Sequence, residues 1–242
     1  TTSLDPFRAD LVGVSLGLAG GRACYIPLGH VGRATQGTFD LGDLGGGDGG
    51  AAKGDAPKQI PLKRVLEALK PLLADASVLK IGQNIKYDMQ VLARHGIEIA
   101  PFDDTMLLSY VLEGGLHGHG MDELAALHLG HATIKFADVT GTGKSRITFD
   151  RVALDAALAY AAEDADVTYR LHEVLKPRLA GESLVAVYET LERPLVPVLA
   201  AMEREGIKVD AGALMSLSED FAKRLALLEG DIHRLAGRAF NI

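Results

Sequence analysis

The sequence has one cysteine, no long apolar run and no excess of basic residues. Cys24 has no partner for an internal disulfide, and no CxxC pair is available for zinc, so a reducing compartment such as the cytoplasm is expected. No apolar run approaches the roughly 20 residues that span a bilayer. The N-terminus also lacks the basic and then apolar regions of a signal peptide. We therefore expect no membrane association.

The formal net charge is −7, which argues against a protein that coats duplex DNA with a broad basic surface. It does not exclude a metal-dependent nuclease, because such an enzyme concentrates carboxylates around its cations. Hydrophobic residues make up 48% of the chain and charged residues 24%, as in ordinary folded proteins. The chain starts at Thr1 and ends directly after a helical pattern, so we expect it to be cut from a longer polypeptide at both ends.

The N-terminal part predicts an α/β arrangement. Residues 11–18 and 23–27 form two strand-like runs around a Gly-Gly turn and predict a hairpin. Residues 31–59 are rich in Gly and predict a low-complexity surface loop. A helical pattern follows over residues 62–73, in which Pro71 should kink or end the helix.

A short buried strand is expected at residues 78–82, followed by a helix from Asn84, as the N-cap, to Gly96. Strand followed by helix favours the α/β class. Further helices are expected near residues 105–112, 121–129, 150–179, 182–204 and 211–235. The break at Ala180-Gly181 predicts a domain of residues 1–180, followed by a helical segment, 181–242.

Two pairs of polar residues have helical spacing: Asn84 with Asp88, and Tyr160 with Asp164. Residues four apart share one face of a helix. Alanines surround the second pair and leave room for an approaching group. A buried aspartate needs a cation, a donor or water, but an isolated helical Asp is more often solvated or capping. The pattern alone leaves both interpretations open.

These motifs resemble those of the DEDD exonucleases, in the subclass that carries a Tyr. Asn-x-x-Tyr-Asp at residues 84–88, preceded by Gly-Gln, resembles their second motif, and the Tyr-x-x-x-Asp that ends at Asp164 resembles their third. The matching segments, which include 69–73, 102–107, 144–149 and 160–168, are similar to the 3′-5′ proofreading domain of bacterial family A DNA polymerases. Residues 192–199 and 202–210 resemble the first helices of the polymerase domain. The resemblance implies a ribonuclease H-like fold, a mixed sheet flanked by helices.

The resemblance also implies a chemistry: cleavage of the last phosphodiester at a DNA 3′ end with two divalent metal ions, Mg²⁺ or else Mn²⁺ or Zn²⁺. Carried onto this chain, Asp164 would bind the tighter metal ion and Asp88 the second. Tyr160 would orient the attacking water. The expected partner is the single-stranded 3′ end of a primer-template, and the expected state is a monomer.

Further residues acquire substrate roles from the same resemblance. Leu4 and Phe149 would pack against the terminal bases, although both also have a plain core interpretation. Gln83 and Asn84 would contact the strand, and Lys144 lies in a basic loop that would touch DNA.

The first motif of the family, Asp-x-Glu, would precede Thr1. Without those two carboxylates, this polypeptide is expected to hydrolyse DNA poorly or not at all. Two alternatives remain open: a ribonuclease D-like exonuclease that acts on RNA, and a nuclease-dead module that positions a polymerase.

Two other patterns carry less weight. Residues 141–145 resemble the end of a phosphate-binding P-loop, but Asp138 stands where that pattern needs Gly. His117, His119, His128 and His131 form a loose group. Without cysteine or a convincing ligand register, solvated or capping roles are favoured over zinc binding.

Overall fold

The computed structural model describes residues 1–31 and 57–242, so most of the Gly-rich loop predicted at residues 31–59 lies outside the described residues. The described chain forms two compact units, Thr1–Arg204 and Glu205–Ile242. Within the described residues, no helix is both long enough and apolar enough to cross a membrane.

The predicted hairpin is confirmed. Strand β1 (Gly13–Leu18) pairs with β2 (Arg22–Pro27) in antiparallel register, from Gly13 opposite Pro27 to Leu18 opposite Arg22. Gly20 and Gly21 both have positive φ, at 79° and 69°, as expected where a short turn reverses the chain.

A second, parallel pair joins β3 (Lys80–Gly82) to β4 (Phe102–Asp104). The α/β class is thus confirmed, with the described strands arranged as two separate two-stranded sheets. Strand β4 was not expected, because two consecutive aspartates are uncommon in strands. Here both carboxylates are buried and hydrogen-bonded, so tertiary contacts outweigh the low strand propensity.

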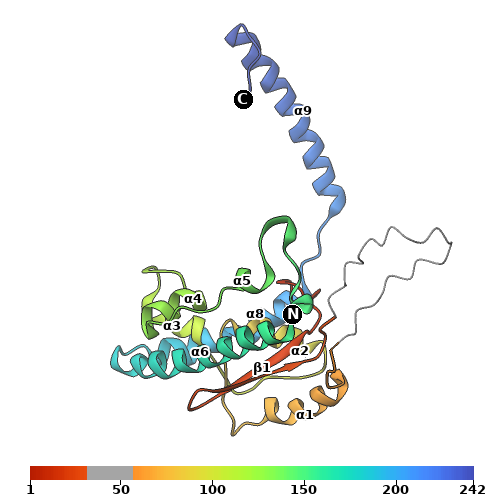
Figure 1. Ribbon diagram of the computed structural model, residues 1–242. Coiled ribbons are helices and arrows are strands. Elements are labelled where there is room, and N and C mark those ends of the chain that lie inside the picture. The colour runs from red at the N-terminus through yellow and green to blue at the C-terminus, as the bar shows by residue number, and fades with distance from the viewer. Residues whose placement is uncertain (32–56) are drawn as a thin grey trace, which may run out of the picture. The chain divides into compact units, whose positions relative to one another are not determined.

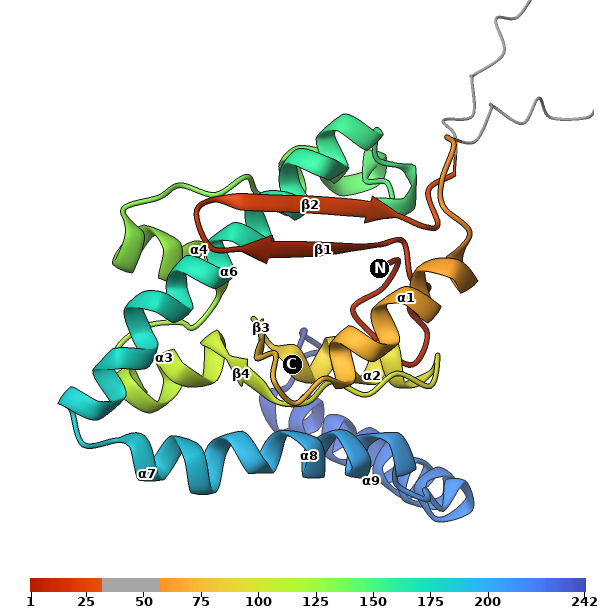
Figure 2. The same ribbon diagram turned by 90° about the horizontal axis from the view of Figure 1, so that it is seen from below.

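The helix α6 (Leu154–Gly181) is one continuous element, whereas the sequence left open whether it was two. In Figures 1 and 2 it runs alongside the β1–β2 hairpin, with which it makes its largest contact surface. A Cβ atom at Gly17 of β1 would lie 2.6 Å from the carbonyl oxygen of Ala165, so glycine permits this close approach. The hairpin therefore rests directly on the part of α6 that carries the Tyr160–Asp164 pair.

Pro71 does not end its helix, contrary to that part of the prediction. Helix α1 extends through it over Leu62–Ala74. Val65, Leu69 and Leu73 are buried on one face, before and after the proline. Burial of that apolar stripe maintains the helix despite the lost backbone hydrogen bond.

The remaining helical elements follow the predicted pattern with shifted ends. Residues Ala125–Leu129 and Tyr188–Glu192 form π-helical turns, and Gly143–Ser145 and Phe149–Arg151 form 3₁₀ turns. The α-helices are α2 (Ile85–Ala93), α3 (Thr105–Glu113), α4 (Met121–Leu124), α5 (Phe136–Thr140), α7 (Val185–Val187), α8 (Arg193–Glu205) and α9 (Ala211–Ala236).

The first compact unit extends to Arg204 and so includes most of α8, whereas the sequence predicted a domain boundary near residue 180. Val196 and Ala200 of α8 are buried. Glu203 accepts a hydrogen bond from Gln90 of α2 at 2.6 Å and pairs with Lys86. These contacts attach α8 to the α/β part of the chain. In the second unit, α9 is capped by the Asp210 side chain, which accepts a hydrogen bond from the Ala213 amide at 3.0 Å.

Asp104 of β4 caps two helices at once. Its carboxylate accepts hydrogen bonds from the amides of Asn84 at 3.0 Å and Ile85 at 2.9 Å, at the start of α2. It also accepts one from Met106 at 2.9 Å, in the first turn of α3. Asn84 occupies the N-cap position as predicted, but its side chain makes no capping hydrogen bond, and its backbone is left-handed, with φ of 55°. The cap comes from Asp104 instead.

We expect Asp104→Ala to lower the free energy of unfolding by about 1 to 2 kcal/mol, because amides of both helices lose their acceptor. Urea unfolding followed by circular dichroism would measure the change. Glu98→Ala removes an exposed carboxylate with no hydrogen bond and should change stability little. Equal stability of the two variants would contradict the capping role.

Candidate active site

Asp88 lies on α2, one turn from its N-terminal end, and remains accessible to solvent. Burial is nevertheless the largest of the effects that raise its pKa to about 7, and the nearby Asp104 carboxylate adds to them. Asp88 therefore presents an accessible carboxylate whose ionised form the neighbouring Asp104 disfavours.

The N-terminal segment lies beside Asp88. The Tyr87 hydroxyl donates a hydrogen bond to the carbonyl oxygen of Ser3 and lies 2.6 Å from Thr1 Oγ1. Burial lowers the pKa of the Thr1 amino group, and the negative charges of Asp88 and Asp150 oppose this shift. Thr1 is thus close to both carboxylates.

Tyr160 and Asp164 form a pair on α6, as the spacing predicted. Burial raises the pKa of Asp164 to about 7, and the charges of Asp122 and Glu163 add to this shift. The interaction with the Tyr160 hydroxyl acts against it. Burial, followed by the Asp164 charge, raises the pKa of Tyr160 above its usual range. The phenol is therefore neutral at neutral pH and can act as a hydrogen-bond donor.

Aromatic residues surround Tyr160. Its ring centroid is 5.7 Å from that of Phe149 and 5.9 Å from that of Phe136. Phe149 is 7% exposed and belongs to a core cluster with Val12 and Val152. In this structure Phe149 supports the position of Tyr160, in line with the core interpretation, and its contact with bases stays a prediction.

Asp88 and Asp164 come from different helices, and no hydrogen bond joins them among the described residues. A series of neighbours connects them instead. The charges of Asp88 and Asp150 both act on the Thr1 amino group, and Asp150 follows Phe149, which packs on Tyr160. The convergence of Asp88 and Asp164 on one site stays a prediction.

The other predicted substrate residues differ in exposure. Leu4 is 92% exposed, and Asn84 and Lys144 are also exposed. Gln83 is half-buried, and its amide nitrogen donates to the His119 carbonyl oxygen at 2.8 Å, while its oxygen accepts from Thr105 at 2.5 Å. The amide group of Gln83 is thus already hydrogen-bonded to other residues of the chain.

Sequence reasoning missed several carboxylates around the site. Asp104 and Asp150 influence Asp88 and Thr1, although Asp104 lies within a segment that matched the family. Glu163 accepts hydrogen bonds from His131 Nε2 at 2.8 Å and the Ile134 amide at 2.6 Å. His131 thus orients the acidic residue next to Asp164, a role that no sequence spacing indicates.

The family model described as 3′-5′ exonuclease, of the DNA polymerase A type, matches residues 1–180. An α/β fold with this family match places the chain in the exonuclease class. The chain therefore belongs to the 3′-5′ exonuclease family of A-type DNA polymerases.

Curated relatives agree with the family model. DNA polymerase I of Rhizobium leguminosarum is 52% identical over 251 residues, which cover 100% of this chain and 23% of that protein. DNA polymerase I of Pseudomonas aeruginosa is 43% identical over 246 residues, covering 100% of this chain and 25% of that protein. The chain spans about a quarter of the length of these relatives.

Solved structures are similar in fold. Brucella melitensis NrnC has a TM-score of 0.58 and 23% identity, covering 85% of this chain and 82% of its own. The POL domain of Pol1 from M. smegmatis, in complex with DNA primer-template and dNTP, has a TM-score of 0.60 and 24% identity. That match covers 76% of this chain and 29% of the other.

Proposed function

We propose that this chain contributes the metal-dependent 3′-5′ exonuclease site of a DNA polymerase, which removes nucleotides from DNA 3′ ends during replication and repair. The observation that carries the proposal is the position of Thr1 next to Asp88. In the family, the Asp-x-Glu motif comes immediately before the segment that resembles residues 1–5. A motif attached before Thr1 would therefore end beside the carboxylate of Asp88.

The acidic residues suit divalent cations with oxygen ligands. Asp88 and Asp164 both have a pKa raised to about 7, and in each case burial is the largest cause and neighbouring carboxylates add to it. A bound cation would favour their ionised forms and relieve the repulsion. Hard ions such as Mg²⁺ and Mn²⁺ prefer carboxylate ligands of this kind. Brucella melitensis NrnC, a neighbour in fold, is known with bound Mg²⁺.

We propose that Asp164 holds the tighter ion and Asp88 the second of two. When bound, the ions would polarise the phosphate and stabilise the charge that develops on the leaving oxygen. Tyr160 would donate its hydrogen bond to orient the attacking water. Leu4, with its exposed side chain, would pack against the terminal base.

Asn84 and Lys144 would contact the DNA strand, since both are exposed and polar. Gln83 could reach the strand only by releasing the His119 carbonyl oxygen. The whole protein, by analogy with the curated relatives, would be a DNA polymerase I that works as a monomer in the cytoplasm. Its polymerising activity would require parts of those relatives that this chain does not span.

The test is hydrolysis of a 3′-labelled single-stranded DNA with Mg²⁺ or Mn²⁺. We expect residues 1–242 alone to release nucleotides slowly or not at all. The same chain preceded by a segment that ends in Asp-x-Glu should gain activity by about 100-fold or more, because ligands of the tighter ion are restored. A matched segment ending in Asn-x-Gln is the control, and equal activity of all three polypeptides would overturn the assignment.

An RNA substrate separates the main proposal from its alternative. The NrnC structures, one of them bound to pGG, are in line with the ribonuclease D-like alternative. The curated relatives are DNA polymerases and favour DNA as the substrate. The Asp-x-Glu chain should therefore prefer DNA over RNA of the same sequence. Preference for RNA would support the ribonuclease D-like alternative, and inactivity on both at high Mn²⁺ would support the nuclease-dead module.

A further inference from the structure

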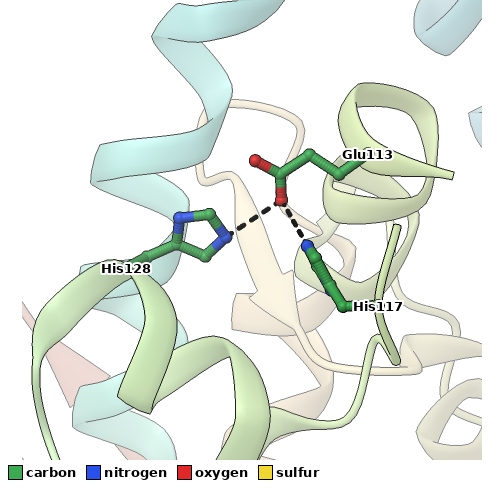
Figure 3. Close-up of side chains that lie close together, drawn as sticks. All are labelled: Glu113, His117 and His128. Atoms are coloured by element: carbon green, nitrogen blue, oxygen red, sulfur yellow. Dashed lines mark hydrogen bonds and ion pairs between the residues drawn. The ribbon is translucent and has the colours of Figure 1, made fainter. Parts of the chain in front are cut away.

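Three side chains that sequence analysis did not group converge at one end of α3. Glu113 ends that helix, His117 follows in the loop of residues 114–120, and His128 comes from the π-helical turn (Figure 3). Their ligand atoms all lie within 4.8 Å of one another. The Nε2 atoms of His117 and His128 lie 2.8 Å and 3.1 Å from the same oxygen, Glu113 Oε2.

The three side chains are mostly shielded from solvent. Their exposed fractions are 13% for Glu113, 15% for His117 and 10% for His128. Each still retains an open edge, so an ion could enter without unfolding the loop. The other two histidines of the predicted group are used elsewhere: His119 Nδ1 lies 2.8 Å from Ser109 Oγ, and His131 contacts Glu163.

We propose that Glu113, His117 and His128 bind a divalent transition-metal ion of the zinc class. Two imidazoles and one carboxylate are a ligand set that zinc accepts, with a fourth position left for water. In a tetrahedral zinc site the ligand atoms lie roughly 3.4 Å apart, given metal–ligand lengths of about 2.1 Å. The observed separations of 2.8 Å and 3.1 Å need only a small widening to admit the ion.

The surrounding hydrogen bonds orient the ligands as metal sites require. His117 Nδ1 lies 2.6 Å from the Gly118 carbonyl oxygen, which fixes the ring with Nε2 directed at the cluster. Glu113 Oε1 accepts a hydrogen bond from Arg178 Nη1 at 2.6 Å, which leaves Oε2 for the ion. Partners of this second layer set the tautomer of the histidine and the direction of the carboxylate.

Arg178 limits the affinity of this site for zinc, because the positive charge of its guanidinium group repels a metal ion bound to Glu113. Part of that charge is neutralised by Glu182, whose carboxylate lies 3.0 Å from Arg178 Nε. Glu123 of α4 accepts a hydrogen bond from the Gly118 amide of this loop at 3.2 Å. An ion here would hold the 114–120 loop, whose His119 carbonyl oxygen accepts the hydrogen bond from Gln83.

The test measures zinc binding by the metal-stripped chain in competition with a chromophoric chelator. We expect one zinc ion per chain at this site, and the double variant His117→Gln/His128→Gln should bind it about 100-fold more weakly or less. His95→Gln is the matched control, because His95 is an exposed histidine outside the cluster. Its zinc affinity should equal that of the unchanged chain.

Two further measurements separate this site from the candidate active site. Asp88→Asn/Asp164→Asn should retain the zinc ion, and Co²⁺ should give a visible absorption band that disappears in the double histidine variant. Circular dichroism would verify that each variant is folded, and the single variants His117→Gln and His128→Gln replace the double one if it is not. Unchanged affinity in the histidine variants, or loss of the ion in the aspartate variant, would overturn the proposal.

Discussion

Replacing Asp164 by alanine, in a chain that carries Asp-x-Glu before Thr1, should reduce the rate of nucleotide release from DNA 3′ ends by about a thousandfold. The reason is the loss of a proposed ligand of the tighter metal ion. Metal ions contribute several kcal/mol to stabilising the transition state, and each 1.36 kcal/mol corresponds to a factor of ten. The measurement is single-turnover hydrolysis of labelled single-stranded DNA at saturating Mg²⁺.

Variants on the same helix sharpen this test. Asp155→Ala removes an exposed carboxylate of α6 and should leave the rate unchanged. Tyr160→Phe keeps the aromatic packing with Phe149 but removes the hydroxyl, so a smaller decrease of about tenfold to a hundredfold is expected. If Asp164→Ala retained the full rate while remaining folded, the assignment of the site would be wrong.

The second large effect concerns stability. Asp103, which is 1% exposed, accepts hydrogen bonds from His172 Nε2 at 2.8 Å, Lys176 Nζ at 3.1 Å and the Tyr188 hydroxyl at 3.1 Å. Arg193 approaches the same carboxylate at 3.4 Å. We expect Asp103→Asn to lower the free energy of unfolding by about 2 to 3 kcal/mol, because the charge-assisted hydrogen bonds of this buried group are lost. Lys176 and Arg193 are then left with the carboxylate of Glu189.

Urea unfolding at neutral pH would measure the effect of Asp103→Asn, with the exposed Asp10→Asn as control. Burial acts to raise the pKa of Asp103, but the hydrogen bonds from His172 and Lys176 outweigh it and hold the pKa below its usual value. Because the pKa of Asp103 is lower in the folded than in the unfolded protein, the ionised carboxylate stabilises the folded state at any pH above the unfolded pKa. This stabilisation is lost as the pH falls through the folded-state pKa. The difference in free energy of unfolding between the unchanged chain and Asp103→Asn should therefore shrink below roughly pH 4. A gap that did not depend on pH would contradict the ionic explanation.

The local order of elements was readable from the sequence because it depends on periodicity and turn residues. The hairpin, α3 and α9 followed from alternating or helical spacing and from glycine turns. The Tyr160–Asp164 pair followed from helical geometry alone, since residues four apart share a face. The exonuclease family was indicated by short motifs in the correct order and is confirmed by the family match.

Other features required contacts between distant segments. Strand β4 and the continuity of α1 through Pro71 depend on burial and hydrogen bonding that override local preference. Asp104 caps a helix that begins 19 residues earlier in the chain, so no spacing rule could assign it. Sequence analysis did not group Glu113 with His117 and His128, because Glu113 is not a histidine and lies on another element.

By itself, the sequence determined which side chains can bind cations and on which helices they stand, because residue type and helical spacing are local properties. Only the tertiary structure decided that Thr1 lies beside Asp88, that α6 packs against Gly17, and that Glu113 meets His117 and His128. The physical reason is that burial and electrostatic repulsion depend on what surrounds a group in space, and those neighbours come from remote parts of the chain.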